Sequence, residues 1–251
     1  MRSACWIPKL GVWALIVAFV MSTQGCGRKY KSSLTFYVLC VNPPSGVLAP
    51  VNTLIGAVFT PDCDVHSVRV WVADSKGRGV YGRLETYSNF LILKPFRNLS
   101  PGETYEVRIS NIHAVGDTSQ VYNIAFSFKT SDEVDETPPR ITRILQLVNV
   151  DGSIKRLPLD VPVRPDGAFL IVFSEPMFQR EFNPRSGIII EPGVVESMHV
   201  TFPTVTEARL DVNGLLEDTT YTIKLKKGLF WDLAGNPTPE HSFTFRTEER
   251  E

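Results

Sequence analysis

The residues most able to do chemistry are spread along the chain without the spacing that catalysis requires. The four histidines are His66, His113, His199 and His241, and none belongs to a His-Glu-x-x-His zinc motif. The sequence also lacks a Gly-x-Ser-x-Gly nucleophile elbow, a phosphate-binding glycine loop and a dinucleotide fingerprint. We therefore expect no catalytic residues, no cofactor and no enzymatic activity.

Two acidic residues, Glu175 and Asp232, lie on separate predicted loops and are the sequence's candidates for calcium ligands. Hard cations such as Ca²⁺ prefer clustered carboxylate oxygens, and a calcium site usually needs more ligands than two side chains supply. The prediction is therefore that the protein holds no metal, with this pair as a minor calcium alternative.

The first 25 residues have the layout of a secretory signal peptide. They contain two basic residues, Arg2 and Lys9, no acidic residue, and an apolar run at residues 10–21. A run of 12 residues fits the apolar core of a signal peptide and is shorter than the roughly 20 that a membrane-spanning helix needs. We expect residues 1–25 to be a signal peptide and the remaining chain to be exported.

The segment that follows the apolar run, Ser22-Thr-Gln-Gly-Cys26, resembles a bacterial lipobox, in which a small residue precedes the cysteine that receives the lipid. It departs from the usual pattern at Thr23 and Gln24, where Leu and then Ala or Ser are common. The resemblance implies that Cys26 is lipidated, that residues 26–33 form a short basic tether, and that the membrane is a partner. The alternative is an ordinary signal peptide, which leaves Cys26 as an unmodified thiol.

Two cysteines, Cys40 and Cys63, remain in the folded part of the chain. Two thiols in an exported protein suggest a disulfide. In an antiparallel sandwich the start of the first strand lies near the end of the second, and the two cysteines fall at about those places. The alternative is a pair of buried, reduced cysteines.

The composition is that of an ordinary globular protein, with 251 residues, 43% of them hydrophobic, and 26 basic residues against 27 acidic ones. Nucleic acid is not an expected partner, because no excess of Lys or Arg is available to replace phosphate counterions. Short alternating apolar runs predict strands at residues 54–59, 67–73, 90–93, 105–109, 124–128, 141–150, 168–173, 187–190, 198–202, 208–212, 221–225 and 242–245. Many short strands separated by turn residues predict β-sandwiches.

The strand pattern occurs twice along the chain. The first copy contains Phe59, Tyr105 and Thr130, and the second contains Phe173, Tyr221 and Thr247. The spacing from the phenylalanine to the tyrosine is 46 residues in one copy and 48 in the other, and from the tyrosine to the threonine it is 25 and 26. This internal repeat predicts two domains, at residues 34–131 and 140–248, joined by an acidic, proline-closed linker at residues 132–139.

The second copy carries a set of five short motifs, Thr137-Pro-Pro139, Ile171-Val-Phe-Ser-Glu-Pro-Met177, Thr220-Tyr-Thr-Ile223, Asp232-Leu-Ala-Gly-Asn236 and Phe243-Thr-Phe-Arg-Thr247. Together they resemble the bacterial Ig-like domain of the SbsA type, known from S-layer proteins. The first copy keeps Leu99-Ser-Pro-Gly-Glu-Thr-Tyr105 and lacks Ser-Glu-Pro-Met and Asp-x-Ala-Gly-Asn. The predicted fold is therefore all-β, with two tandem Ig-like Greek-key β-sandwiches, the first of them divergent.

The motifs have structural explanations. In the shared pattern Leu-x-x-x-x-Thr-Tyr, which ends at Tyr105 and at Tyr221, the ring can pack on the core while the hydroxyl bonds a nearby backbone group, as in the tyrosine corner of Ig sandwiches. Gly235 offers a position with positive φ, and the side chains of Asp232 and Asn236 can fix a turn around it.

The resemblance implies a structural or adhesive role at the cell surface. We expect a lipoprotein of the bacterial envelope, in the outer membrane or at the cell surface, that contacts an envelope protein or glycan; without the lipid it would be secreted. The alternative function is a glycan- or peptidoglycan-binding accessory module of an exported complex. A patch formed by the aromatic residues Trp71, Tyr81, Tyr87 and Phe90 would favour glycan binding, whereas their usual role is to fill the core.

Overall fold

The computed structural model describes residues 37–60, 63–64, 67–87, 89–115, 117–180 and 182–249. The predicted signal peptide at residues 1–25, Cys26 and the tether at residues 26–33 therefore lie outside the described residues. Residues 34–251 form one compact unit. Among the residues that the structure describes, no helix has both the length and the hydropathy required to cross a bilayer.

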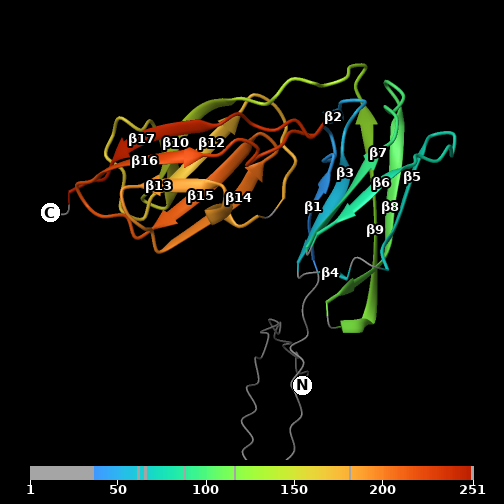
Figure 1. Cartoon of the computed structure of the whole chain (residues 1–251), viewed down its shortest axis with the longest axis horizontal. Helices are drawn as coiled ribbons and strands as arrows, with labels where there is room; N and C mark the ends of the chain where they lie inside the picture. Colours follow the sequence, from blue (N-terminus) through green and yellow to red (C-terminus); the bar gives the residue numbers. More distant parts are fainter. Residues whose placement is uncertain are drawn as a thin grey trace, which may run out of the picture. The chain divides into compact units, whose positions relative to one another are not determined.

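In the first half of this unit, up to residue 131, the described residues form the strands β1 to β9, which Figure 1 labels. They are β1 (Tyr37–Asn42), β2 (Leu48–Ala49), β3 (Ile55–Thr60), β4 (Cys63–Asp64), β5 (Arg69–Asp74), β6 (Gly82–Thr86), β7 (Phe90–Pro95), β8 (Thr104–Ala114) and β9 (Asp117–Thr130). One sheet has the order β1-β3-β7-β6 and the other the order β2-β9-β8-β4, with β5 also paired to β8. All pairs are antiparallel except the short parallel pair of β2 with β9.

In the second half, from residue 140, the residues that the structure describes form eight strands and one short helix. They are β10 (Ile141–Val150), β11 (Ser153–Leu157), β12 (Ala168–Phe173), the 3-10 helix η1 (Pro184–Ser186), β13 (Ile188–Glu191), β14 (Ser197–Thr204), β15 (Glu207–Asn213), β16 (Thr220–Leu225) and β17 (His241–Arg246). The sheets have the orders β11-β10-β12-β15-β14 and β13-β16-β17, and all their strand pairs are antiparallel.

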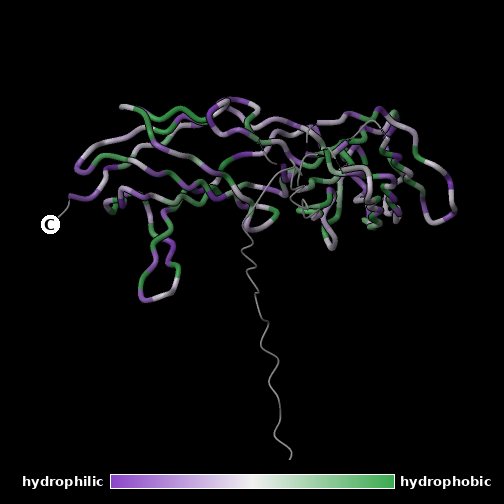
Figure 2. The backbone as a smooth tube through the Cα atoms, turned by 90° about the horizontal axis from the view of Figure 1, so that it is seen from below, coloured by the Kyte–Doolittle hydropathy of each residue, from purple (hydrophilic) through white to green (hydrophobic). Residues whose placement is uncertain are grey.

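Each half buries its own core between its two sheets. In β8 the side chains of Tyr105, Val107 and Ile109 point into the core while the intervening residues lie at or near the surface. This two-residue alternation is what a sheet with one face in water requires, and polar and apolar segments alternate along much of the chain in Figure 2. The second core is formed in the same way, by buried side chains of β12, β15, β16 and β17. The prediction of an all-β fold made of β-sandwiches is confirmed.

The tyrosine corner predicted for both copies is present in both. The hydroxyl oxygen of Tyr105 accepts a hydrogen bond from the backbone N–H of Ser100 at 2.8 Å, and that of Tyr221 accepts one from Leu216 at 2.8 Å. The ring of Tyr105 stacks on Phe128 with centroids 5.6 Å apart, and the second copy repeats this stack at 5.8 Å. The repeat seen in the sequence therefore corresponds to a repeated set of contacts.

The threonine that ends each repeat closes the same turn. The Oγ1 atom of Thr130 donates to the carbonyl of Ser100 at 2.7 Å and accepts from the N–H of Glu103 at 3.0 Å. In the second half, the Oγ1 atom of Thr247 donates to the carbonyl of Leu216 at 2.6 Å and accepts from the N–H of Thr219 at 2.9 Å. In each half the final strand is thus tied to the loop that carries the tyrosine corner.

The two halves contact each other directly. Strand β3 is buried on both faces, because one face lines the first core and the other meets Phe178 of the second half. Phe178 packs in a small apolar cluster that also contains Leu54, Val58, Phe90 and Ile92. The backbone N–H of Leu54 donates to the carbonyl of Leu233 at 2.7 Å.

Candidate functional site

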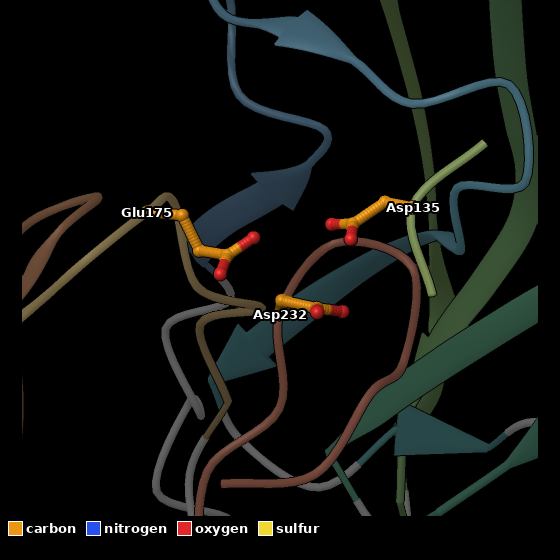
Figure 3. A group of neighbouring side chains, drawn as sticks. All are labelled: Asp135, Glu175 and Asp232. Carbon is orange, nitrogen blue, oxygen red and sulfur yellow. The ribbon is translucent and has the colours of Figure 1, made fainter. Parts of the chain in front are cut away.

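Three carboxylates meet beside the contact between the halves. Asp135, Glu175 and Asp232 each place one oxygen so that the three oxygens lie within 4.8 Å of one another (Figure 3). Within the described part of the chain, this is the one group of three or more His, Cys, Asp or Glu side chains arranged closely enough to hold a metal ion. We call these three residues the carboxylate cluster.

Asp135 belongs to the segment that joins the halves, and its backbone is held from both sides. Its N–H donates to the Oδ1 atom of Asn52 at 3.0 Å, and its carbonyl accepts from the Nδ2 atom of Asn52 at 2.7 Å. The same carbonyl accepts from the Nδ2 atom of Asn236 at 3.0 Å. The connecting segment is therefore pinned between the first half and the second, and this fixes the position of the Asp135 carboxylate.

Glu175 follows the end of β12 and is half-buried. The hydroxyl of Ser174 donates to Glu175 Oε1 at 3.3 Å. Ser174 is itself fixed, because its N–H donates to the carbonyl of Arg140 at 2.9 Å and its hydroxyl oxygen accepts from the N–H of Arg140 at 3.0 Å. These contacts hold the loop that carries Glu175 against the start of the second half.

Asp232 lies in the loop between β16 and β17 and is 0% exposed. Its Oδ1 atom accepts from the backbone N–H of Asn236 at 2.8 Å and its Oδ2 atom accepts from Asn236 Nδ2 at 2.9 Å. Gly235 adopts a φ of 89° in this turn, a conformation that favours glycine. The roles predicted for Asp232, Gly235 and Asn236 in fixing a turn are confirmed.

Burial and like charge raise the pKa values of Glu175 and Asp232. The pKa of Glu175 is raised to about 7, first by burial and then by the charge and hydrogen bond of Asp135 and the charge of Asp232, while the hydroxyl of Ser174 opposes the rise. Burial also raises the pKa of Asp232, against the hydrogen bonds from Asn236 that lower it. Besides burial, the negative charge of nearby carboxylates disfavours the ionised form of Glu175, because like charges repel at short range.

The carboxylate cluster has no basic partner among the ion pairs of residues 37–249 that the structure describes. Its negative charge must therefore be reduced in another way, by a proton or by a cation. Carboxylate oxygens are the ligands that Ca²⁺ prefers, and calcium takes six to eight oxygens, so water or backbone carbonyls would supply the remainder. The arrangement is chemically suited to either occupant.

The structure brings together the two calcium candidates predicted from the sequence and adds a third carboxylate. Glu175 and Asp232 are 57 positions apart in the sequence, yet their side chains converge in Figure 3. Asp135 was not predicted, because its segment was interpreted only as a stiff linker. A signal was present in the acidic character of that linker, since an acidic segment next to two acidic loops favours a shared site. Calcium binding stays the alternative to the prediction that no metal is bound.

The cysteines and histidines do not form a site in the described residues. Cys40 lies on β1, and its Sγ atom donates to the carbonyl of Gln179 at 3.4 Å. The side chain of Cys63 is outside the described residues, so the disulfide with Cys40 stays a prediction. His113, His199 and His241 lie on three different strands, β8, β14 and β17, and His66 is outside the described residues.

The four aromatic residues considered for a glycan-binding patch are in three different settings. Trp71 lies on β5, with the guanidinium carbon of Arg108 5.0 Å from its ring centroid. Tyr87 stacks on the buried ring of Phe90 at 4.2 Å. Tyr81, in contrast, lines a cleft and is 80% exposed. Of the four, Phe90 alone is buried, so most of them do not fill the core, and Tyr81 alone lines the cleft.

Comparison with known proteins gives distant structural similarities. No protein-family model matches the chain, and no curated protein does. Among solved structures, it is similar to an LD-transpeptidase in complex with imipenem (17% identity, TM-score 0.26), with 61% of this chain and 63% of the other covered. It is also similar to a fragment of titin (13% identity, TM-score 0.23; 82% and 93% covered).

A third similar structure is SGBP-B from a mixed-linkage glucan utilization locus of Bacteroides ovatus, in complex with a mixed-linkage heptasaccharide. The identity is 14% and the TM-score is 0.22, with 85% of this chain and 47% of the other covered. The chain thus spans less than two thirds of the transpeptidase and about half of SGBP-B.

Proposed function

We propose that the protein is a non-enzymatic lipoprotein of the bacterial cell envelope that presents two SbsA-type Ig-like sandwiches for structural or adhesive contacts with envelope proteins. The observation that carries the proposal is the order of the parts: a signal-like apolar run, then Cys26 in a lipobox-like segment, then two sandwiches. In this proposal Cys26 carries the lipid and residues 26–33 are the tether. Acyl chains contribute about 0.8 kcal/mol per buried CH₂ to membrane attachment.

The contacts between the halves support a presenting role. The apolar cluster around Phe178 and the hydrogen bond from Leu54 to Leu233 tie the sandwiches together, and the linker is pinned at Asp135. A preorganised surface pays less conformational entropy when it binds a partner. Two joined sandwiches are therefore better suited to presenting a fixed surface than two modules on a free linker would be.

Strand β1 is the feature most suited to a protein contact. It is an edge of its sheet in the described part of the chain, and it carries Tyr37 and Leu39, which are 61% and 48% exposed. Edge strands offer backbone hydrogen-bonding groups to an added strand, and exposed apolar side chains add contact area. The proposal places a protein partner at this edge.

The alternative function, a glycan- or peptidoglycan-binding accessory module, is favoured by a different observation. The first half carries a cleft of about 440 Å³ in which Tyr81 and Phe96 are both largely exposed. Clefts of roughly 300–1,000 Å³ with aromatic walls and a few polar groups are typical of small-ligand sites.

The lipoprotein proposal is tested by replacing Cys26. In Cys26→Ala the exported protein should leave the membrane fraction and appear in the soluble fraction, because the acylated side chain is gone. Cys5→Ala is the matched control, since Cys5 lies within the predicted signal peptide, and it should stay with the membrane. Membrane association that is unchanged in Cys26→Ala would show that the lipid is not the anchor.

The contact at β1 is tested separately by cross-linking in intact cells. The double substitution Tyr37→Ser with Leu39→Ser should remove the cross-linked species formed by the wild-type protein, while Cys26-dependent fractionation stays the same. The exposed residue Val194 is a suitable control, because it is 88% exposed and lies in the second half. If Val194→Ser reduces cross-linking as much as the β1 variant does, the edge is not the contact.

A further inference from the structure

The cleft on the first half lies between two segments that flank the β6–β7 hairpin. Its volume is about 440 Å³, and its lining includes Asp74, Arg78, Tyr81, Phe96, Arg97 and Asn98. Tyr81 directly precedes β6 and Phe96 directly follows β7. The backbone N–H of Phe96 donates to the carbonyl of Tyr81 at 2.9 Å, which continues the antiparallel ladder by one step beyond the pair of Gly82 with Pro95.

The two aromatic rings of the cleft are unusually exposed. Tyr81 is 80% exposed and Phe96 is 72% exposed. Directly opposed residues in an antiparallel pair have their Cβ atoms about 4.5–5.5 Å apart, so the rings leave the backbone at neighbouring points. A single exposed aromatic side chain needs no explanation, whereas two neighbouring ones in a cleft indicate a surface that is covered in use.

The polar side of the cleft is built on a rigid turn. The carboxylate of Asp74 is buried, and it accepts from the backbone N–H of Lys76 at 3.0 Å and of Arg78 at 2.8 Å. It also accepts from Arg78 Nε at 2.6 Å, which holds the exposed guanidinium of Arg78 at the cleft. Gly77 completes the turn with a φ of 76°. The Arg78 guanidinium is therefore held by the Asp74 carboxylate, which is itself held by the backbone N–H groups of the turn.

Arg97 supplies a second, uncommitted cation. It is exposed, lies in the cleft lining beside Phe96, and takes part in none of the ion pairs of the described residues. Asn98, next to it, offers an amide donor and acceptor. Two arginines against one aspartate give the charged lining a net charge of +1 (2 minus 1), and the aspartate is already used by Arg78.

We propose that this cleft binds a carboxylate-bearing glycan. The apolar C–H face of a sugar ring packs on Tyr81 and Phe96, the planar guanidinium of Arg97 pairs with the sugar carboxylate, and Asn98 hydrogen-bonds the hydroxyls. The inference deepens the glycan-binding alternative and rests on the chain being exported. It does not depend on the lipid at Cys26, so the two can fail separately.

A carboxylate-bearing glycan can come from two sources, the cell's own peptidoglycan and an external acidic polysaccharide. Binding of the full-length protein to trigalacturonate is measured by calorimetry, with cellotriose as the neutral counterpart, and binding to purified peptidoglycan sacculi is measured by co-sedimentation. We expect binding to at least one acidic glycan and at least tenfold weaker binding to cellotriose. Sedimentation with sacculi identifies the envelope source, and binding to trigalacturonate alone identifies the external one.

The cleft variants decide whether binding occurs at this place. Tyr81→Ala and Phe96→Ala should each weaken binding about tenfold. Arg97→Gln should weaken binding to the acidic glycan and leave binding to cellotriose unchanged. The controls are Trp71→Ala, an exposed aromatic side chain on β5, and Arg83→Ala, an exposed arginine on β6; neither lines the cleft, and neither should change binding.

Three outcomes would overturn the inference. They are binding to neither acidic glycan, equal binding of cellotriose, and acidic-glycan binding that the three cleft variants leave unchanged. Because Tyr81, Phe96 and Arg97 are exposed, their substitution should not unfold the chain, and a circular dichroism spectrum of each variant checks this. Fractionation of Cys26→Ala reports on the anchor alone, whatever the glycan result.

Discussion

The side chain of Glu175 faces two other acids, and this makes the stability of the protein depend on pH. Its pKa is raised to about 7, so the folded chain holds this proton more tightly than the unfolded chain, in which the pKa is near 4.5. The resulting stabilisation is fully present below pH 4.5 and is lost as the pH rises through about 7. A cation bound between the carboxylates would offset their repulsion and so restore the stability that is lost when Glu175 ionises.

We therefore predict that the free energy of unfolding falls by about 1–2 kcal/mol between pH 5 and pH 8, a range discounted for the partial exposure of Glu175. Glu175→Gln should remove most of this fall, because its amide carries no charge at either pH. Denaturant titrations at both pH values measure the effect. Glu240→Gln, an exposed acid outside the carboxylate cluster, is the control and should keep the wild-type fall.

Calcium distinguishes the two possible occupants of the carboxylate cluster. If a cation binds there, Ca²⁺ at pH 8 should raise the melting temperature of the wild-type protein and have little effect on Glu175→Gln. An equal rise in both proteins would mean that the ion binds elsewhere.

The sequence identified Glu175 and Asp232 but not Asp135, because sequence alone does not show that a linker residue lies beside two loops that follow it by 40 and 97 positions.

At the scale of elements, strands with a buried face were predictable and exposed strands were not. Strand β12 was predicted with its observed bounds, since its residues are almost all buried and apolar. Strand β11 was missed, because its residues are exposed and its pairing with β10 follows from the hairpin turn at Asp151 and Gly152, which have φ values of 52° and 80°. Strand β6 was missed for the same reason.

The tyrosine corners should contribute similarly to both halves. Tyr221→Phe removes the acceptor for the N–H of Leu216, and Tyr105→Phe removes the acceptor for Ser100. Each change should lower the free energy of unfolding by about 1–2 kcal/mol in denaturant titrations. Tyr81→Phe, whose side chain is exposed, should be nearly neutral. A neutral result for both corner variants would mean that water replaces the hydroxyl without cost.

At the scale of the molecule, the sequence predicted two repeats but not the contact between them. The apolar run of β3 was recognised as a strand, but its composition alone does not show that its second face packs against Phe178. Two cores remain distinct, one in each half, and this favours independent folding of the halves.

We predict that a fragment of residues 135–251 folds cooperatively by itself. Loss of the first half exposes Phe178, which should cost the fragment about 1.5–3 kcal/mol relative to the same region in the whole chain. Phe178→Ala should accordingly destabilise the full chain by about 3 kcal/mol and change the fragment little. Circular dichroism during thermal unfolding measures both effects. A random-coil spectrum for the fragment would refute the two-domain division.

The equivalence of the two closing strands has a consequence for assembly. Thr130 at the end of β9 and Thr247 just after β17 bond equivalent loops through the same atoms. During folding, the final strand of one half can meet the equivalent loop of the other half, in the same chain or in a second molecule. Its threonine would still find the same backbone groups to bond there. We therefore expect strand exchange between molecules, with dimers as the product, to be a folding error of this chain at high concentration.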